Sequence, residues 1–109
     1  MSKQLANQHA LLTGAGGGIG VAVARAFAMQ GARCTLVDIA LSPTPDVERL
    51  IADFRGAVQY IASDITQTHT INPMVAQAVA AFGPIHTLFN NAAVFDMAPL
   101  LESSTLETR

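Results

Sequence analysis

The sequence predicts an α/β fold in which helices cover both faces of a doubly wound parallel sheet. Short apolar segments alternate with amphipathic helical segments along the chain, and strands connected through helices pair in parallel. Half of the 109 residues are hydrophobic and only 13% are charged, which suits strands that are buried on both sides. A chain of this length forms one domain at most. We therefore expect a single domain with about four strands in the order 3-2-1-4.

Four short apolar runs are the predicted strands. Each is bounded by turn-forming residues such as Gly14, Pro43 and Ser63, which is typical of strands rather than of longer buried helices. The four runs cover residues 9–13 (HALLT), 33–39 (RCTLVDI), 57–62 (AVQYIA) and 85–90 (IHTLFN).

Amphipathic segments between these runs are the predicted helices. Gly31 ends the first of them, in the position that favours glycine after a helix. Asn72 is the predicted N-cap of the third helix, and Pro73 its first helical residue. A capping box at 104–107 predicts the start of a further helix. The predicted helices cover residues 18–30, 46–54 and 73–82, with the last one starting near 104.

Composition and charge exclude several classes of function. Six scattered basic residues in a chain of net charge −2 give no electrostatic footprint for nucleic acid. No apolar run is long enough to cross a membrane, and the N-terminal residues lack the apolar core of a signal peptide, so a cytoplasmic location is expected.

Cys34, the single cysteine, is expected to be a buried thiol. His69 has no second ligand at metal-binding spacing, and His9 and His86 are expected as surface or rim residues rather than ligands, so no metal site is predicted.

Five glycines lie between residues 14 and 20, where the first strand leads into the first helix. A helix N-terminus carries unpaired backbone N–H groups and a partial positive charge, and a diphosphate is a natural ligand for that position. Glycine lets a phosphate approach the backbone because no Cβ stands in the way. The turn reads T-G-x-x-x-G-x-G from Thr13 to Gly20, and no lysine follows it, which excludes a Walker loop.

Asp38 stands at the end of the second strand. A carboxylate there can accept both ribose hydroxyls of an adenosine, each charge-assisted bond being worth about 1.5–3 kcal/mol. A 2′-phosphate would face a like charge, and at about 4 Å with an effective dielectric near 20 the repulsion is of order 4 kcal/mol per unit charge pair. Neither the next residues nor the glycine turn supply an arginine. The sequence therefore predicts NAD rather than NADP.

Two more polar stretches follow the third and fourth strands. Asp64 and Ile65 could hold an adenine by its amino group and its face, although Asp64 taken alone is typical of a cap for the next segment. The paired asparagines Asn90 and Asn91 could line the same crevice, although taken alone they are equally typical of a plain turn. Their common position after strand ends favours one shared site.

Together these stretches resemble the short-chain dehydrogenase/reductase family in its classical single-domain form. The matching motifs are TGAGGGIG (13–20), the strand-end Asp38, SDIT (63–66) and NNAA (90–93), in the family's order. The resemblance covers nearly the whole chain. It implies a Rossmann-type fold and an oxidoreductase that passes hydride between NAD and a small-molecule alcohol or carbonyl. The cofactor-binding residues that it implies are Gly14, Gly17, Gly18, Ile19 and Gly20 at the pyrophosphate, Asp38 at the adenine ribose, Asp64 and Ile65 at the adenine, and Asn91 and Ala92 at the cofactor's ribose region.

The chain departs from the family pattern in three places. Ala93 stands where glycine is usual, and Pro73 falls where the family's helix is already under way, so a late start or a kink is expected there. The family's catalysis depends on a serine and a Tyr-x-x-x-Lys pair, but Tyr60 is the only tyrosine and Lys3, the only lysine, precedes it. No catalytic residue is therefore predicted in this chain. We expect residues 1–109 to be an incomplete NAD-binding domain, the N-terminal part of a longer enzyme, and inactive alone.

Three functions are compatible with these features. The leading hypothesis is an NAD-dependent oxidoreductase for which this chain supplies the dinucleotide-binding half. The second is a non-catalytic NAD-binding module or a truncated gene product. A methyl-donor-binding enzyme is disfavoured because Leu12 and Thr13 stand where that class has an acidic residue. A four-stranded piece also leaves its last strand without a neighbour, so we expect a homo-oligomer or a marginally stable chain.

Overall fold

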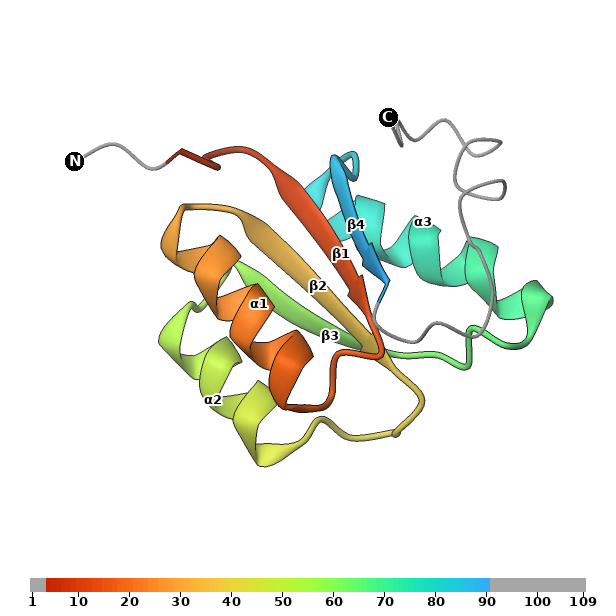
Figure 1. The fold of residues 1–109 in the computed structure, drawn as a ribbon. Helices are drawn as coiled ribbons and strands as arrows, with labels where there is room; N and C mark the ends of the chain where they lie inside the picture. Colours follow the sequence, from red (N-terminus) through yellow and green to blue (C-terminus); the bar gives the residue numbers. More distant parts are fainter. Residues whose placement is uncertain (1–3, 91–109) are drawn as a thin grey trace.

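The computed structural model describes residues 4–90, which form a four-stranded parallel sheet with helices packed against it (Figure 1). The sheet order is β3-β2-β1-β4, and every neighbouring pair is parallel, so the predicted α/β fold and strand order are confirmed. The elements, in chain order, are β1 (His9–Thr13), α1 (Gly18–Met29), β2 (Arg33–Asp38), α2 (Pro45–Asp53), β3 (Val58–Ala62), the 3₁₀-helix η1 (Thr68–Thr70), α3 (Ile71–Phe82) and β4 (Thr87–Asn90).

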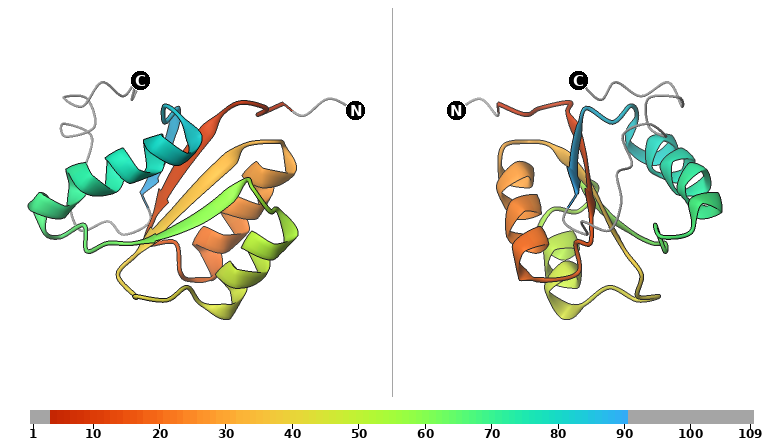
Figure 2. Two further views of the ribbon diagram at one scale, coloured as in Figure 1. Left: turned by 180° about the vertical axis from the view of Figure 1, so that it is seen from behind. Right: turned by 45° about the vertical axis from the view of Figure 1, so that its right-hand side comes forward.

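Helices cover both faces of the sheet, as predicted. Figure 2 shows α1 and α2 on one face and α3 on the other. Successive side chains of a strand point to opposite faces, so Leu12 packs into the layer with Leu50 of α2, whereas Leu11 packs into the layer with Met74 of α3. Both leucines are fully buried, which explains why the strands are apolar along their length.

The third helix begins earlier than predicted. α3 starts at Ile71, so Asn72 is not its N-cap, and Pro73 lies inside the first turn. Proline is tolerated there because the first amides of a helix have no helical partner. Thr70 is the N-cap residue, and its hydroxyl donates to the carbonyl of Asp64 at 2.7 Å. The η1 turn therefore leads directly into α3, and the helix does not start late.

The other boundaries differ from the predictions by one or two residues. β2 ends at Asp38 rather than Ile39, and β4 begins at Thr87. α2 begins at Pro45, one residue early, because the side chain of Thr44 accepts the amide of Val47 and caps the helix. The helix predicted from the capping box at 104–107 lies outside the described residues.

His9 is buried at the amino end of the sheet, so the expectation of a surface or rim position was wrong. The residue is only 1% exposed. Its Nδ1 lies 2.8 Å from the carbonyl oxygen of Gly83, and its Nε2 lies 2.7 Å from the hydroxyl of Thr35. A carbonyl only accepts, so Nδ1 carries the proton and Nε2 accepts from the hydroxyl. Gln59 donates to the same hydroxyl oxygen at 2.8 Å, and this His9 cluster ties three strands to the turn before β4.

We expect acid to destabilise the protein through this histidine. Burial is the main cause that lowers the pKa of His9, the neighbouring His86 and Arg33 lower it further, and only the hydrogen bond to Gly83 raises it. The unfolded chain takes up a proton near the ordinary pKa of about 6.5, whereas the folded chain does not. The stabilising contribution is therefore complete above that value and is lost as the pH falls through the lowered pKa.

Urea unfolding at about pH 7.5 and about pH 5.5 measures this effect as a change in the free energy of unfolding. His9→Gln is the matched control because its amide does not titrate. The loss of stability on acidification should be larger in the original protein than in the variant. An equal loss in the two proteins would show that His9 is not the source.

Candidate functional site

The carboxyl ends of the four strands meet at one edge of the sheet, where the predicted site lies. Strand pairing places Thr13 beside Val37 and beside Asn90, and Asp38 beside Ala62. The Thr13 hydroxyl donates to Oδ1 of Asn90 at 2.8 Å, which joins β1 and β4 where the strand order reverses. Ligands of open α/β sheets bind outside the carboxyl ends of the strands at such a switch point.

The glycine turn connects this edge to the start of α1. Gly14 has a φ of +63°, a conformation that strongly favours glycine. Gly17 is the N-cap of α1, no side chain caps the helix, and its first turn contains no acidic residue. The first hydrogen bond of the helix runs from the amide of Val21 to the carbonyl of Gly17 at 3.1 Å. The amides of residues 18–20 precede that bond, so the helix start can receive an anion.

The glycines of this turn have different roles. A Cβ at Gly17 or Gly18 would meet nothing within 4 Å, so open space lies in front of both residues. A Cβ at Gly20 would lie 2.6 Å from the Cα of Ala15, so Gly20 is required for packing the turn on the helix. Ile19, which lies between Gly18 and Gly20, is 67% exposed. The turn therefore combines a packed base with an accessible surface for a ligand.

Asp38 lies directly beside the glycine turn. Its Oδ2 accepts the amide of Gly16 at 2.7 Å, and its Oδ1 accepts the amide of Ile39 at 2.7 Å. A carboxylate offers about four acceptor positions, so it can still accept the hydroxyls of a ribose. A Cβ at Gly16 would lie 2.5 Å from Oδ2. Gly16 therefore belongs to the site, although the sequence pattern did not distinguish it from the other glycines of the turn.

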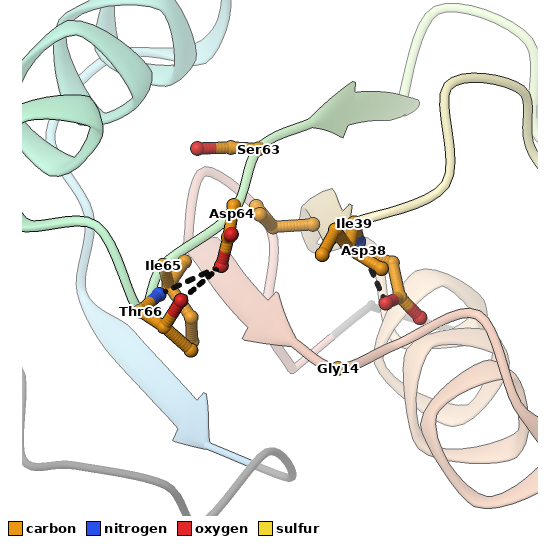
Figure 3. Close-up of a pocket in the computed structure, with 8 residues that line it drawn as sticks. Gly14, Asp38, Ile39, Ser63, Asp64, Ile65 and Thr66 are labelled. Carbon is orange, nitrogen blue, oxygen red and sulfur yellow. Dashed lines mark hydrogen bonds between the residues drawn. The ribbon is translucent and has the colours of Figure 1, made fainter.

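A pocket of about 180 Å³ lies next to Asp38 (Figure 3). Whole-ligand pockets have volumes of about 300–1,000 Å³, so this one suits a single planar part of a larger ligand. Oδ1 of Asp64 accepts the amide and the hydroxyl of Thr66, and Ile65 is buried against the core. The pocket thus brings together three predicted residues, Asp38, Asp64 and Ile65. The residues that line it are Gly14, Val37, Asp38, Ile39, Ser63, Asp64, Ile65 and Thr66.

A second pocket, of about 390 Å³, continues from the first toward α3 and shares Ser63 and Asp64 with it. His69 and Gln77 also line this space. Neither this pocket nor the lining role of Ser63 and Thr66 was predicted from the sequence. Both residues lie inside the SDIT motif, which was the available signal.

The remaining predicted site residues, Asn91 and Ala92, lie outside the described residues.

Within residues 4–90, the structure brings together no group of three or more His, Cys, Asp or Glu side chains that could hold a metal ion. No helix in that part of the chain is both long and apolar enough to cross a membrane.

Two chemically reactive residue types have structural roles here. Cys34 is buried, as predicted, and burial raises the pKa of its thiol to about 12, so the thiol stays protonated and unreactive. The hydroxyl of Tyr60 donates to the carbonyl of Ala40 at 2.6 Å, which holds the loop after β2. Burial, and next the charge of Asp38, raises the pKa of Tyr60, which keeps this donor protonated.

The chain is similar to known proteins along most of its length. A family model described as short chain dehydrogenase matches residues 8–108. Galactitol 2-dehydrogenase of Agrobacterium fabrum is 39% identical over 97 residues, which are 89% of this chain and 37% of that protein. Sorbitol dehydrogenase of Cereibacter sphaeroides is 38% identical over 91% of this chain and 38% of that protein. The chain thus spans less than two fifths of these relatives.

Solved structures share the fold. The 3-ketoacyl-(acyl-carrier-protein) reductase from Brucella melitensis, complexed with NADH, is 32% identical with a TM-score of 0.68, over 78% of this chain and 34% of that chain. The C-domain of a bacterial malonyl-CoA reductase, with NADP, is 28% identical with a TM-score of 0.75, over 84% of this chain and 16% of that chain. Both nicotinamide cofactors thus occur among the structural neighbours. The family match, the relatives and the sheet order agree, and the chain belongs to the short-chain dehydrogenase family.

Proposed function

We propose that the chain supplies the dinucleotide-binding part of an NAD-dependent oxidoreductase that acts on a small-molecule alcohol or carbonyl compound. The observation that carries the proposal is the hydrogen bond between Asp38 and the glycine turn, which puts a carboxylate beside the open start of α1. The family uses nicotinamide dinucleotide cofactors. Galactitol and sorbitol dehydrogenases among the relatives support an alcohol as substrate.

In this proposal each part of the cofactor has its own contacts. The amides at Gly17 and Gly18 bind the diphosphate, where no side chain blocks the approach. Asp38 accepts the hydroxyls of the adenine ribose, and the pocket with Asp64 and Ile65 holds the adenine. Asn91 and Ala92 contact the cofactor's ribose region. When the cofactor is bound, its nicotinamide supplies the hydride chemistry. The residues of this chain bind and orient the cofactor.

Calorimetric titration of the 109-residue chain with NAD tests the binding, and a crystal structure of the NAD complex tests the place. We expect saturable binding, with the diphosphate over the start of α1 and the adenine in the pocket beside Asp38. The absence of binding, or a cofactor placed elsewhere on the molecule, would refute the proposal.

A non-catalytic NAD-binding module is the second candidate function, because the sequence contains no Tyr-x-x-x-Lys. Both candidates predict NAD binding and no turnover by the 109-residue chain alone, so the reading frame separates them. The enzyme hypothesis expects a Tyr-x-x-x-Lys in the open reading frame if that frame continues past Arg109, and the module hypothesis expects none. Formation of NADH by the purified 109-residue chain with any alcohol would remove the module hypothesis.

We also propose a cytoplasmic protein that forms homo-oligomers. Within residues 4–90, β4 pairs with β1 alone and β3 with β2 alone, so both are edge strands, and edge strands favour association. We expect size-exclusion chromatography with light scattering to give a mass above that of one chain, or a broad thermal transition. A monodisperse monomer with a sharp cooperative melt would contradict this expectation.

A further inference from the structure

Thr44 connects two parts of the molecule through one hydroxyl group. It is the N-cap of α2, and its Oγ1 accepts the amide of Val47 at 3.3 Å. The same hydroxyl donates to the carbonyl oxygen of Gly16 at 3.2 Å. A hydroxyl has one proton to donate and two acceptor positions, so both bonds form together. Thr44 is partly buried, which limits competition from water.

Gly16 is thereby held on both sides of its backbone. Asp38 accepts its amide at 2.7 Å, and Thr44 donates to its carbonyl. The two side chains come from the end of β2 and the start of α2, and Gly16 immediately precedes the N-cap of α1. α1 and α2 lie side by side on one face of the sheet, and their N-termini are at the same end of the molecule (Figure 1). The start of α2 therefore supports the start of α1.

We propose that Thr44 is a positioning residue for cofactor binding. By holding the Gly16 carbonyl, it fixes the orientation in which the amides at Gly17 and Gly18 meet the diphosphate. This inference rests on the proposed function, because it concerns the same site. Helix capping alone does not need a hydroxyl, since an ionised aspartate caps a helix equally well but has no proton to donate to Gly16.

Three variants of Thr44 and one control test this role. Thr44→Val removes both. Thr44→Gly also removes both bonds, yet glycine is a favoured N-cap residue that costs a helix little stability relative to threonine, so this variant stays folded if Thr44→Val does not. Thr44→Ser keeps both bonds. Thr68→Val is the matched control, because Thr68 is an exposed threonine in η1.

Two measurements decide the role of Thr44. Calorimetry compares the affinities for NAD and for adenosine, which lacks the diphosphate. We expect Thr44→Gly to weaken NAD binding about fivefold, the equivalent of one neutral hydrogen bond, with little change for adenosine. Thr44→Ser and Thr68→Val should bind both ligands normally. Amide hydrogen exchange of residues 16–19 in the free protein should be faster in Thr44→Gly.

The exchange measurement needs no cofactor, so it distinguishes failure of this inference from failure of the proposed function. If the original protein does not bind NAD, the proposed function fails. The exchange measurement alone then tests whether Thr44 orders the glycine turn. Unchanged exchange in the glycine turn of Thr44→Gly, or an equal loss of affinity for NAD and adenosine, would overturn the positioning role.

Discussion

The Asp38→Asn variant is expected to lose most of the preference for NAD over NADP. Asparagine keeps the size of the side chain but removes the charge that opposes a 2′-phosphate, a repulsion of order 4 kcal/mol per unit charge pair. Affinity for NAD should also fall, because charge-assisted bonds to the ribose hydroxyls, worth about 1.5–3 kcal/mol each, become neutral ones. The ratio of the two dissociation constants should change by about a hundredfold or more.

Calorimetry with NAD and NADP on both proteins measures this ratio. Asp53→Asn is the matched control, because it removes the same charge from the far end of α2, where Asp53 pairs with Arg25 at 3.0 Å. That control should keep the original preference. Equal binding of NAD and NADP by the unmodified chain, or tighter binding of NADP, would contradict the cofactor assignment.

The Gly20→Ala variant is expected to lower the free energy of unfolding by about 1–3 kcal/mol, as overpacking does in a well-packed core. The new Cβ would lie 2.6 Å from the Cα of Ala15, and a backbone atom cannot move aside without shifting the whole turn. NAD binding should decrease as a consequence of that shift. Urea unfolding and calorimetry measure the two effects.

Gly18→Ala is the informative comparison, because a Cβ there meets no protein atom within 4 Å. Replacing a helical glycine with alanine stabilises a helix by roughly 0.5–1 kcal/mol, so this variant should be at least as stable as the original protein. It should nevertheless bind NAD more weakly, since the Cβ occupies the space in front of the helix start. If Gly18→Ala bound NAD normally, the diphosphate would not lie where we place it.

The sequence was sufficient to predict the strands and their order. β1 has the predicted bounds because an apolar run ends at Gly14, whose backbone conformation stops the strand. The three residues Asp38, Asp64 and Ile65 were predicted to meet, and they line one pocket. The regular alternation of strands and helices brings all carboxyl ends to the same edge, and the ligand of that pocket stays a prediction.

The features that could not be predicted depend on contacts between distant residues. The requirement for glycine at position 16 comes from the Asp38 carboxylate, 22 residues away. The burial of His9 depends on Thr35 and Gln59, which only the strand register brings next to it. Asn72-Pro73 has the local pattern of a helix start, but the η1 turn before it begins α3 sooner. Local patterns give no information on such contacts.

The His9 cluster has a consequence for how the molecule responds to its surroundings. It lies at the amino ends of the strands, whereas the proposed nucleotide site lies at the carboxyl ends. Mild acidity would therefore loosen the protein at the end of the sheet opposite the proposed coenzyme site. Substitutions at the two ends of the sheet would then adjust acid tolerance and the affinity of the proposed site independently.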